Sequence, residues 1–315
     1  MKRKSIAVIG GGTGTFTVLS GLKNYPVELS AIVAMADNGG STRILREEFG
    51  ILPPGSVRPA LVALSGAEKS LADLFNYRFS NGNGLSGHNF GNLFLTALTN
   101  QLGSFQKALK ETAKILRLRG EVLPSTLQDV QLYAQLENGD VIEGEANIDV
   151  PTHNGELRIE KVWLKPKCKA NPEALKALAK ANLIVIAPGD IFSSILPNFL
   201  PAGMKQAFQK SRAKKVYVCN LMTKYGETNG FQVHDFVDTI EAYAGKDSLD
   251  YVLVNGKKPS LSRIQKYEEK RSEVIIYDPA ALRKRKIRVV QKPLLRKRGF
   301  IRHDSDLLAE AILSL

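Results

Sequence analysis

The stretch Ser5-Ile6-Ala7-Val8-Ile9-Gly10-Gly11-Gly12-Thr13-Gly14-Thr15 decides the fold. A short apolar, β-branched run ends in glycines and threonines, and an amphipathic segment from Phe16 to Leu22 follows at once. This order predicts a strand, a glycine-rich turn and a helix. Glycines let the backbone approach a ligand, and the N-terminus of a helix offers free N–H groups to an anion. We therefore expect phosphate or pyrophosphate to bind at Gly11, Gly12, Thr13, Gly14 and Thr15.

The glycine pattern matches no nucleotide-binding motif completely. Gly10 and Gly12 fit the first two positions of the dinucleotide fingerprint G-x-G-x-x-G, but Thr15 stands where the third glycine belongs. A P-loop is excluded because no Gly-Lys-Ser/Thr follows. Three interpretations stay open: an NAD site, a site for a nucleoside diphosphate in a Rossmann-like fold, and a tight turn without a ligand. The second fits the sequence best.

Length and composition are those of a globular protein. The 315 residues are 43% hydrophobic and 24% charged, which suits one large α/β domain, 1–315, or two smaller ones. We expect no membrane span, because no apolar run approaches the ~20 residues that a bilayer requires. Residues 1–4 lead into a strand too short for a signal peptide. Cys168 and Cys219 are the only cysteines, which favours a reducing cytoplasm over a disulfide framework. Four scattered histidines argue against a structural zinc site.

The positive charge is concentrated in one segment. Residues 257–302 contain 16 Lys/Arg and four acidic residues, a balance of +12 out of a net charge of +13. This basic C-terminal segment could be a solvated face, a surface for an anionic ligand or partner, or a source of nucleic-acid affinity. It contains no recognisable nucleic-acid motif, and its aromatic residues are not interleaved as a stacking platform requires.

Polar residues follow every predicted parallel strand. These strands are residues 28–35, 183–187, 215–219, 251–254 and 274–277. The carboxyl ends of parallel strands meet at one edge of an open α/β sheet, which is where such sheets bind ligands. Asp37 also lies near the position where a Rossmann fold places the acid that holds a ribose. The candidate residues in these loops are Asp37, Asn38, Gly39, Ser41, Gly189, Asp190, Ser193, Ser194, Asn220, Thr223 and Lys224.

A Gly/Asn-rich loop, residues 82–92, precedes an apolar helix. Asn89 or Ser86 is suited to cap that helix. His88 would then stand at the helix N-terminus, either as a structural residue or, with Asn89 and Asn92, as part of a site.

The hydrophobic period changes from 3.6 to 2 beyond Pro124. Residues 130–136 and 141–145 flank Glu137-Asn138-Gly139-Asp140, which predicts a β-hairpin. Ile148 and residues 158–164 are candidates for further strands. Residues 121–165 are therefore expected to form a small β insertion. The rest is expected to be a Rossmann-like, doubly wound α/β domain with a mostly parallel sheet.

The motifs together resemble the bacterial gluconeogenesis factor family, which is related in fold to 2-phospho-L-lactate transferase. The resemblance covers essentially the whole chain. It rests on residues 9–14, 36–41, 87–93, 187–198 and 219–228, on Tyr267 and on Arg302-His303-Asp304. It implies a cytoplasmic protein that binds UDP-sugars and supports normal cell shape and wall synthesis on gluconeogenic carbon sources, together with protein partners in cell-wall synthesis. It also implies that Tyr267 and Arg302 belong to the ligand site. It implies no established reaction.

The transferase relatives use a divalent metal and acidic residues near the phosphates. The corresponding segment here, residues 53–58, contains no carboxylate, so that only the distant Asp37 and Asp190 remain as candidate ligands. Three hypotheses follow. The chain is a UDP-sugar-binding regulator, which we favour and which needs no metal. Alternatively it is a Mg²⁺-dependent phosphoryl or nucleotide-dependent transferase, or, least supported, a nucleic-acid-binding protein. A homo-oligomer is compatible with each.

Overall fold

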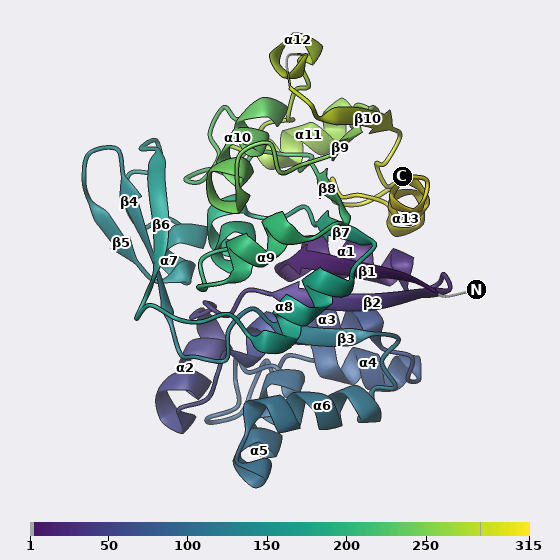
Figure 1. The fold of residues 1–315 in the computed structure, drawn as a ribbon. Coiled ribbons are helices and arrows are strands. Elements are labelled where there is room, and N and C mark those ends of the chain that lie inside the picture. The colour runs from purple at the N-terminus through teal and green to yellow at the C-terminus, as the bar shows by residue number, and fades with distance from the viewer. Residues whose placement is uncertain (1–2, 284) are drawn as a thin grey trace.

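The computed structural model describes residues 3–283 and 285–315. Three residues lie outside the described residues. Met1 and Lys2 belong to the stretch that was compared with a signal peptide, and Lys284 belongs to the basic segment. A seven-stranded parallel sheet in the order β10-β9-β8-β7-β1-β2-β3 forms the centre of the fold (Figure 1). Its strands are β1 (Lys4–Gly10), β2 (Val27–Val33), β3 (Glu121–Pro124), β7 (Leu183–Ile186), β8 (Lys214–Val218), β9 (Tyr251–Asn255) and β10 (Arg288–Lys292).

The strand order reverses at β1. The chain moves outward from β1 through β2 to β3, returns to β7 on the other side of β1, and then continues through β8 and β9 to β10. The loops after β1 and β7 therefore diverge and leave a crevice at the carboxyl edge of the sheet. This topological switch point is where doubly wound sheets bind ligands. The predicted α/β class with a mostly parallel sheet and a small β insertion is confirmed.

Helices cover both faces of the sheet (Figure 1). They are α1 (Gly12–Leu22), α2 (Gly40–Phe49), α3 (Pro54–Leu64), α4 (Lys69–Asn76), α5 (Phe90–Leu102), α6 (Phe105–Ile115), α7 (Glu145–Asp149), α8 (Pro172–Lys180), α9 (Met204–Lys210), α10 (Val233–Ala244), α11 (Leu261–Glu268), α12 (Pro279–Leu282) and α13 (Ser305–Leu313). A π-helical turn, Ile191–Ile195, and a 3₁₀ turn, Leu196–Asn198, follow β7. Among the described residues, no helix has the length and apolar character needed to cross a membrane.

The central strands are apolar throughout because their two faces belong to different cores. In β1, Ile6 and Val8 pack with α1, α3 and α13, whereas Ala7 and Ile9 pack on the opposite face with the core that includes α8, α9 and α10. Side chains alternate between the faces of a strand, so a strand covered on both sides reads as one continuous hydrophobic run.

The β insertion is a three-stranded antiparallel sheet in the order β5-β4-β6. It consists of β4 (Gln131–Leu136), β5 (Val141–Glu143) and β6 (Ile159–Lys165), so the predicted hairpin is present. The segment expected as insertion, 121–165, divides in two, because β3 at its start pairs with β2 in the large sheet.

Two expected strands do not form. Ile148 lies in α7, where it is fully buried. Residues 274–277 contribute only an isolated bridge between Val274 and Met222. The seventh strand is instead β10, which lies in the basic segment. Its sequence, Arg-Val-Val-Gln-Lys, carries charges at both ends because it is an edge strand, and edge strands are often protected by charged residues.

Candidate functional site

A cleft of about 250 Å³ lies at the switch point. We call it the first cleft. Its lining combines the glycine loop after β1, the loop after β7, the loop after β8 and residues of the basic segment. The sequence-predicted residues among them are Gly11, Gly12, Thr13, Gly14, Gly189, Asp190, Ser194, Asn220, Tyr267 and Arg302.

The glycine loop presents backbone to this cleft. Among the described residues no side chain caps α1, so its first N–H groups lack a partner there. Gly12 has a φ of +59°, and a Cβ added to it would meet nothing within 4 Å. Thr15 faces inward and donates its hydroxyl to the Gly11 carbonyl at 3.2 Å. The loop therefore has the character of an anion cradle, to which Thr15 contributes shape rather than a free hydroxyl.

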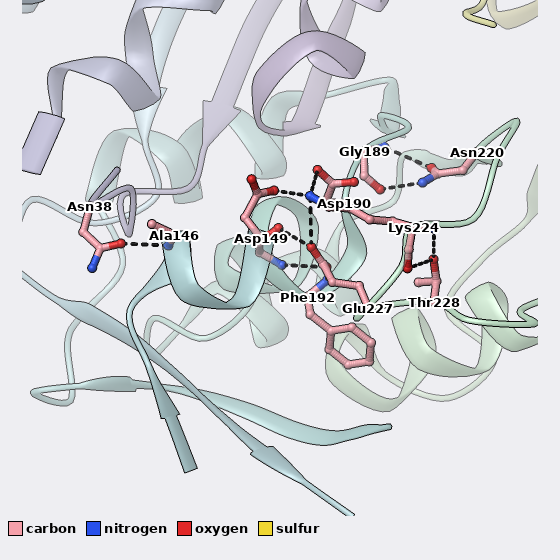
Figure 2. A network of polar contacts seen from close by, with 11 residues as sticks. Asn38, Ala146, Asp149, Gly189, Asp190, Phe192, Asn220, Lys224, Glu227 and Thr228 are labelled. Carbon is pink, nitrogen blue, oxygen red and sulfur yellow. Dashed lines mark hydrogen bonds and ion pairs between the residues drawn. The ribbon is translucent and has the colours of Figure 1, made fainter. Parts of the chain in front are cut away.

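The opposite wall of the first cleft is held by specific hydrogen bonds. The Asn220 side chain accepts from Gly189 N at 3.0 Å and donates to Gly189 O at 2.7 Å, which fixes the loop after β7 (Figure 2). The Tyr267 hydroxyl accepts from Ile301 N at 2.9 Å. That bond ties α11 to the strand-like stretch carrying Arg302, whose guanidinium lies over the Phe300 ring at 5.4 Å from its centroid.

Sequence reasoning did not select His303, which also lines the first cleft. Its side chain is buried, and burial lowers the pKa of the imidazole to about 4. Nε2 has no hydrogen-bond partner among the described residues. His303 therefore contributes a neutral ring with an unused nitrogen. Its position in Arg302-His303-Asp304 was the only available signal.

A second cleft of about 520 Å³ adjoins the first and shares Gly11, Gly12 and Ser194 with it. Predicted residues Asp37, Gly39 and Ser193 line the second cleft, as do Glu145 and Asp149 of α7. Gly40 and Gly55, at the first turns of α2 and α3, complete its wall. The second cleft thus combines helix N-termini, which favour anions, with carboxylates.

The carboxylate of Asp37 already has protein partners. It accepts hydrogen bonds from Gly39 N at 2.9 Å and from the Thr42 hydroxyl at 2.8 Å, and burial raises its pKa above the ordinary value. Glu145 faces the same space. Burial, reinforced by the charges of Asp37 and Asp149, raises the pKa of Glu145 to about 9, so this carboxyl is largely protonated at neutral pH.

Asp190 does not stand alone at the sheet edge. Asp149 of α7 and the buried Glu227 bring carboxylate oxygens to within 4.8 Å of one another and of Asp190. The expectation that Asp37 and Asp190 were the only available acids was therefore wrong. The missed residues come from the insertion and from the turn after β8, which are remote from Asp190 in sequence. We call Asp149, Asp190 and Glu227 the acidic cluster.

Lys224 lies in the middle of the acidic cluster (Figure 2). Its ammonium donates to Asp149 and, at 2.9 Å, to Asp190 Oδ2, and it lies 3.6 Å from Glu227 Oε1. Burial alone would lower the pKa of Lys224, but the three carboxylates more than offset this and raise it. Burial and the charge of Asp190 raise the pKa of Glu227 to about 7.

The remaining predicted residues lie outside both clefts. Asn38 accepts from Ala146 N at 2.9 Å and so ties the loop after β2 to α7 (Figure 2). The Ser41 hydroxyl lies 3.0 Å from His88 Nδ1 and accepts from Asn92 at 3.4 Å, so these three form a buried group of their own. Of the two candidate caps, Asn89 and Ser86, it is Asn89 that caps α5, by accepting from Gly91 N. Thr223 accepts from Glu273 N at 2.8 Å.

Comparison with known proteins agrees with this architecture. Residues 6–295 match the family described as 2-phospho-L-lactate transferase CofD. The chain is 41% identical to the gluconeogenesis factor of Halalkalibacterium halodurans, over 99% of this chain and 97% of the relative. It is 39% identical to that of Bacillus subtilis, over 100% and 98%.

A solved structure is similar over its full length. The crystal structure of a protein from Bacillus halodurans has a TM-score of 0.94 and 40% identity, and the match covers 99% of this chain and 100% of that one. The chain thus belongs to the 2-phospho-L-lactate transferase CofD family, alongside the bacterial proteins named gluconeogenesis factors.

Proposed function

We propose that the chain binds a nucleoside diphosphate sugar, of the UDP class, across the two clefts and acts as a regulatory protein. The observation that carries this proposal is the convergence on one cleft of the uncapped α1 N-terminus with Tyr267 and Arg302. In keeping with the resemblance, we place the protein in the cytoplasm, where it supports cell shape and wall synthesis during gluconeogenic growth and contacts protein partners in that process.

The first cleft would hold the nucleoside diphosphate. Backbone N–H groups at the start of α1 bond the phosphate oxygens, and the glycine positions let them approach closely. Arg302 adds a planar fork that can bond two oxygens. The ring of Tyr267, whose hydroxyl is held by Ile301 N, offers a flat surface to the base.

The second cleft would hold the sugar. The first cleft, at about 250 Å³, is small for a whole nucleotide sugar, but together with the adjoining 520 Å³ it falls within the range usual for ligand sites. Asp37 and Glu145 offer carboxyl oxygens suited to sugar hydroxyl groups. The shared residues Gly11 and Gly12 would lie at the junction, next to the diphosphate.

A second candidate function is a transferase like the 2-phospho-L-lactate transferase for which the family is named. The observation in its favour is the number of carboxyl groups beside the phosphate cradle. A divalent metal such as Mg²⁺ is the cofactor implied, and the acidic cluster is its natural place. The residues there do not fit it, however, because the ammonium of Lys224 already lies between the three carboxylates and Glu227 already accepts hydrogen bonds from other residues. Glu227 accepts from Phe192 N at 2.9 Å and from the Ser193 hydroxyl at 2.9 Å.

Calorimetric titration of the full chain with UDP-, GDP- and ADP-linked sugars tests the proposal. We expect saturable binding with preference for UDP compounds and with the ligand recovered unchanged. Absence of binding by any nucleotide sugar would refute the proposal. Release of a nucleotide product in the presence of Mg²⁺ would favour the transferase. Binding that weakens steeply with salt, and that nucleic acid competes away, would indicate a phosphate-backbone surface instead.

A further inference from the structure

We propose that the ammonium group of Lys224 takes the place of a divalent cation in the acidic cluster, so that Mg²⁺ and similar ions are kept out of it. The chain would then supply its own cation to the acidic cluster.

The spacing of the carboxylates suits a cation. Oxygens of Asp149, Asp190 and Glu227 lie within 4.8 Å of one another. Oxygen ligands of Mg²⁺ or Ca²⁺ stand about 2.0–2.6 Å from the ion, so two ligands of one ion are at most about 4–5 Å apart. Without Lys224, three carboxylates at this distance would repel one another strongly.

Lys224 places its ammonium group against all three carboxylates, with hydrogen bonds to two of them and an ion pair with the third. An ammonium group carries three N–H donors, and Lys224 faces three carboxylates: Asp149, Asp190 at 2.9 Å and Glu227 at 3.6 Å (Figure 2). A divalent ion entering the cluster would have to displace the ammonium or accept a positive charge within contact distance. Mg²⁺ also gives up its water reluctantly, which makes such an exchange more costly.

Hydrogen bonds hold both the turn that carries Lys224 and the side chain of Glu227. Lys224 N donates to the Thr228 hydroxyl at 2.8 Å, and Thr228 N donates to Lys224 O at 2.8 Å, so the turn that carries the lysine is closed (Figure 2). Glu227 is 4% exposed and is anchored by Phe192 N and by Ser193. The backbone of this turn and the carboxylate of Glu227 are therefore fixed, and the ammonium of Lys224 can leave the cluster only by giving up its contacts with Asp149, Asp190 and Glu227.

One consequence rests on the proposed function. Asp190 lines the first cleft, where the diphosphate would bind, so the cluster without Lys224 would carry one more uncompensated negative charge and repel the ligand more strongly. With Lys224 in place, affinity for the nucleotide sugar should be the same in EDTA and in Mg²⁺. The cation inference does not need this consequence, because uptake of a metal by the cluster can be measured without any nucleotide.

The test is uptake of Mn²⁺ by the full chain, followed by the decrease of the electron paramagnetic resonance signal of free Mn²⁺. Five forms are compared: wild type, Asp190→Asn, Lys224→Met, Lys224→Met with Asp190→Asn, and the control Lys176→Met, which removes an exposed lysine paired with Glu173. We expect no uptake at the cluster by wild type or control. Lys224→Met should bind one ion at least about 100-fold more tightly than wild type, because a unit positive charge in contact with the carboxylates is removed. The double variant should lose that uptake.

Three results would overturn the inference: wild-type uptake that Asp190→Asn abolishes, a folded Lys224→Met chain without uptake, or uptake that survives in the double variant. Thermal melting verifies the folded state. If Lys224→Met does not fold, Lys224→Gln replaces it. If neither folds, the wild-type titration decides, since uptake abolished by Asp190→Asn contradicts the inference and absence of uptake supports it. Failure of nucleotide-sugar binding would refute only the proposed function, since Mn²⁺ uptake does not depend on it.

Discussion

Gly14 lies directly against the carbonyl of Pro188. A Cβ built on Gly14 would stand 1.7 Å from that oxygen, far inside van der Waals contact. Gly14 belongs to the first turn of α1 and Pro188 follows β7, so this contact joins the two segments that diverge at the switch point. The crevice between β1 and β7 is thus closed at its base by backbone, and the first cleft begins above it.

Gly14→Ala should therefore destabilise the protein by about 3 kcal/mol or more, since the methyl group meets backbone that cannot move freely. Gly12→Ala is the matched control within the same loop. The added methyl group meets no neighbouring atom, so the free energy of unfolding should fall only by the cost of a positive φ, about 1–2 kcal/mol. The same methyl group stands where the phosphate should approach. Urea unfolding and calorimetry on both variants separate the effects. Equal stability loss in the two variants, or full ligand affinity in a folded Gly12→Ala chain, would contradict this assignment.

Local sequence patterns were sufficient for the features that depend on neighbours in the chain. The turn at residues 10–15, the cap at Asn89 and the hairpin at residues 131–143 were each predictable from a few adjacent residues. The parallel sheet could also be inferred, because buried strands read as continuous apolar runs.

The contribution of the insertion to the site was not predictable. The rule for parallel strands placed Asp190 and Lys224 at the same edge of the sheet, but Asp149 comes from α7 in the insertion, and no local pattern marks its approach to them. The strand assigned to residues 274–277 failed for a related reason. Its apolar residues were taken as a buried strand, whereas the real edge strand β10 is charged at both ends and carries a weak strand signal.

Glu145 should make stability depend on pH. Its pKa is raised from 4.5 to about 9, so the folded state retains a proton that the unfolded chain releases above about pH 4.5. The stabilisation is complete below that pH and is lost as the pH rises towards 9, by up to about 1.4 kcal/mol per pH unit. Glu145→Gln removes this dependence because an amide does not ionise. Unfolding midpoints at pH 6 and pH 9 should therefore differ less in the variant, and an unchanged difference would show that Glu145 titrates normally.

The two thiols should be inert in the folded protein. Cys219 is 1% exposed, and burial raises its pKa to about 12, while burial also raises the pKa of Cys168. Thiolate is the reactive form, so neither residue should react with an aromatic disulfide reagent until the chain unfolds. The measurement is the absorbance of the aromatic thiolate that the reagent releases, with and without denaturant. Rapid reaction of one thiol under native conditions would mean that its surroundings open, and a Cys→Ser variant of each would identify it.

Arg302 should matter more to ligand affinity than any other charge of the basic segment. It lines the first cleft, whereas Lys297, five residues earlier, is exposed and outside the lining. Arg302→Ala should cost about 1.5–3 kcal/mol of nucleotide-sugar binding, the range for a hydrogen bond to a charged group. Lys297→Ala should leave the equilibrium affinity unchanged and alter only the salt dependence of the association rate, because a surface charge steers anions without contacting them.

Tyr267→Phe tests whether the hydroxyl of Tyr267 helps to position Arg302. The Tyr267 hydroxyl accepts from Ile301 N, next to Arg302 in the chain, and the phenylalanine ring keeps the flat surface while it loses that bond. Affinity should fall by less than in Arg302→Ala, and the double variant should lose less than the sum, because both changes act through one guanidinium. The measurement is calorimetry at low and high salt on five chains: wild type, Arg302→Ala, Lys297→Ala, Tyr267→Phe and the double variant. If Arg302→Ala and Lys297→Ala lose affinity alike, the basic segment acts only as a charged surface and Arg302 makes no specific contact.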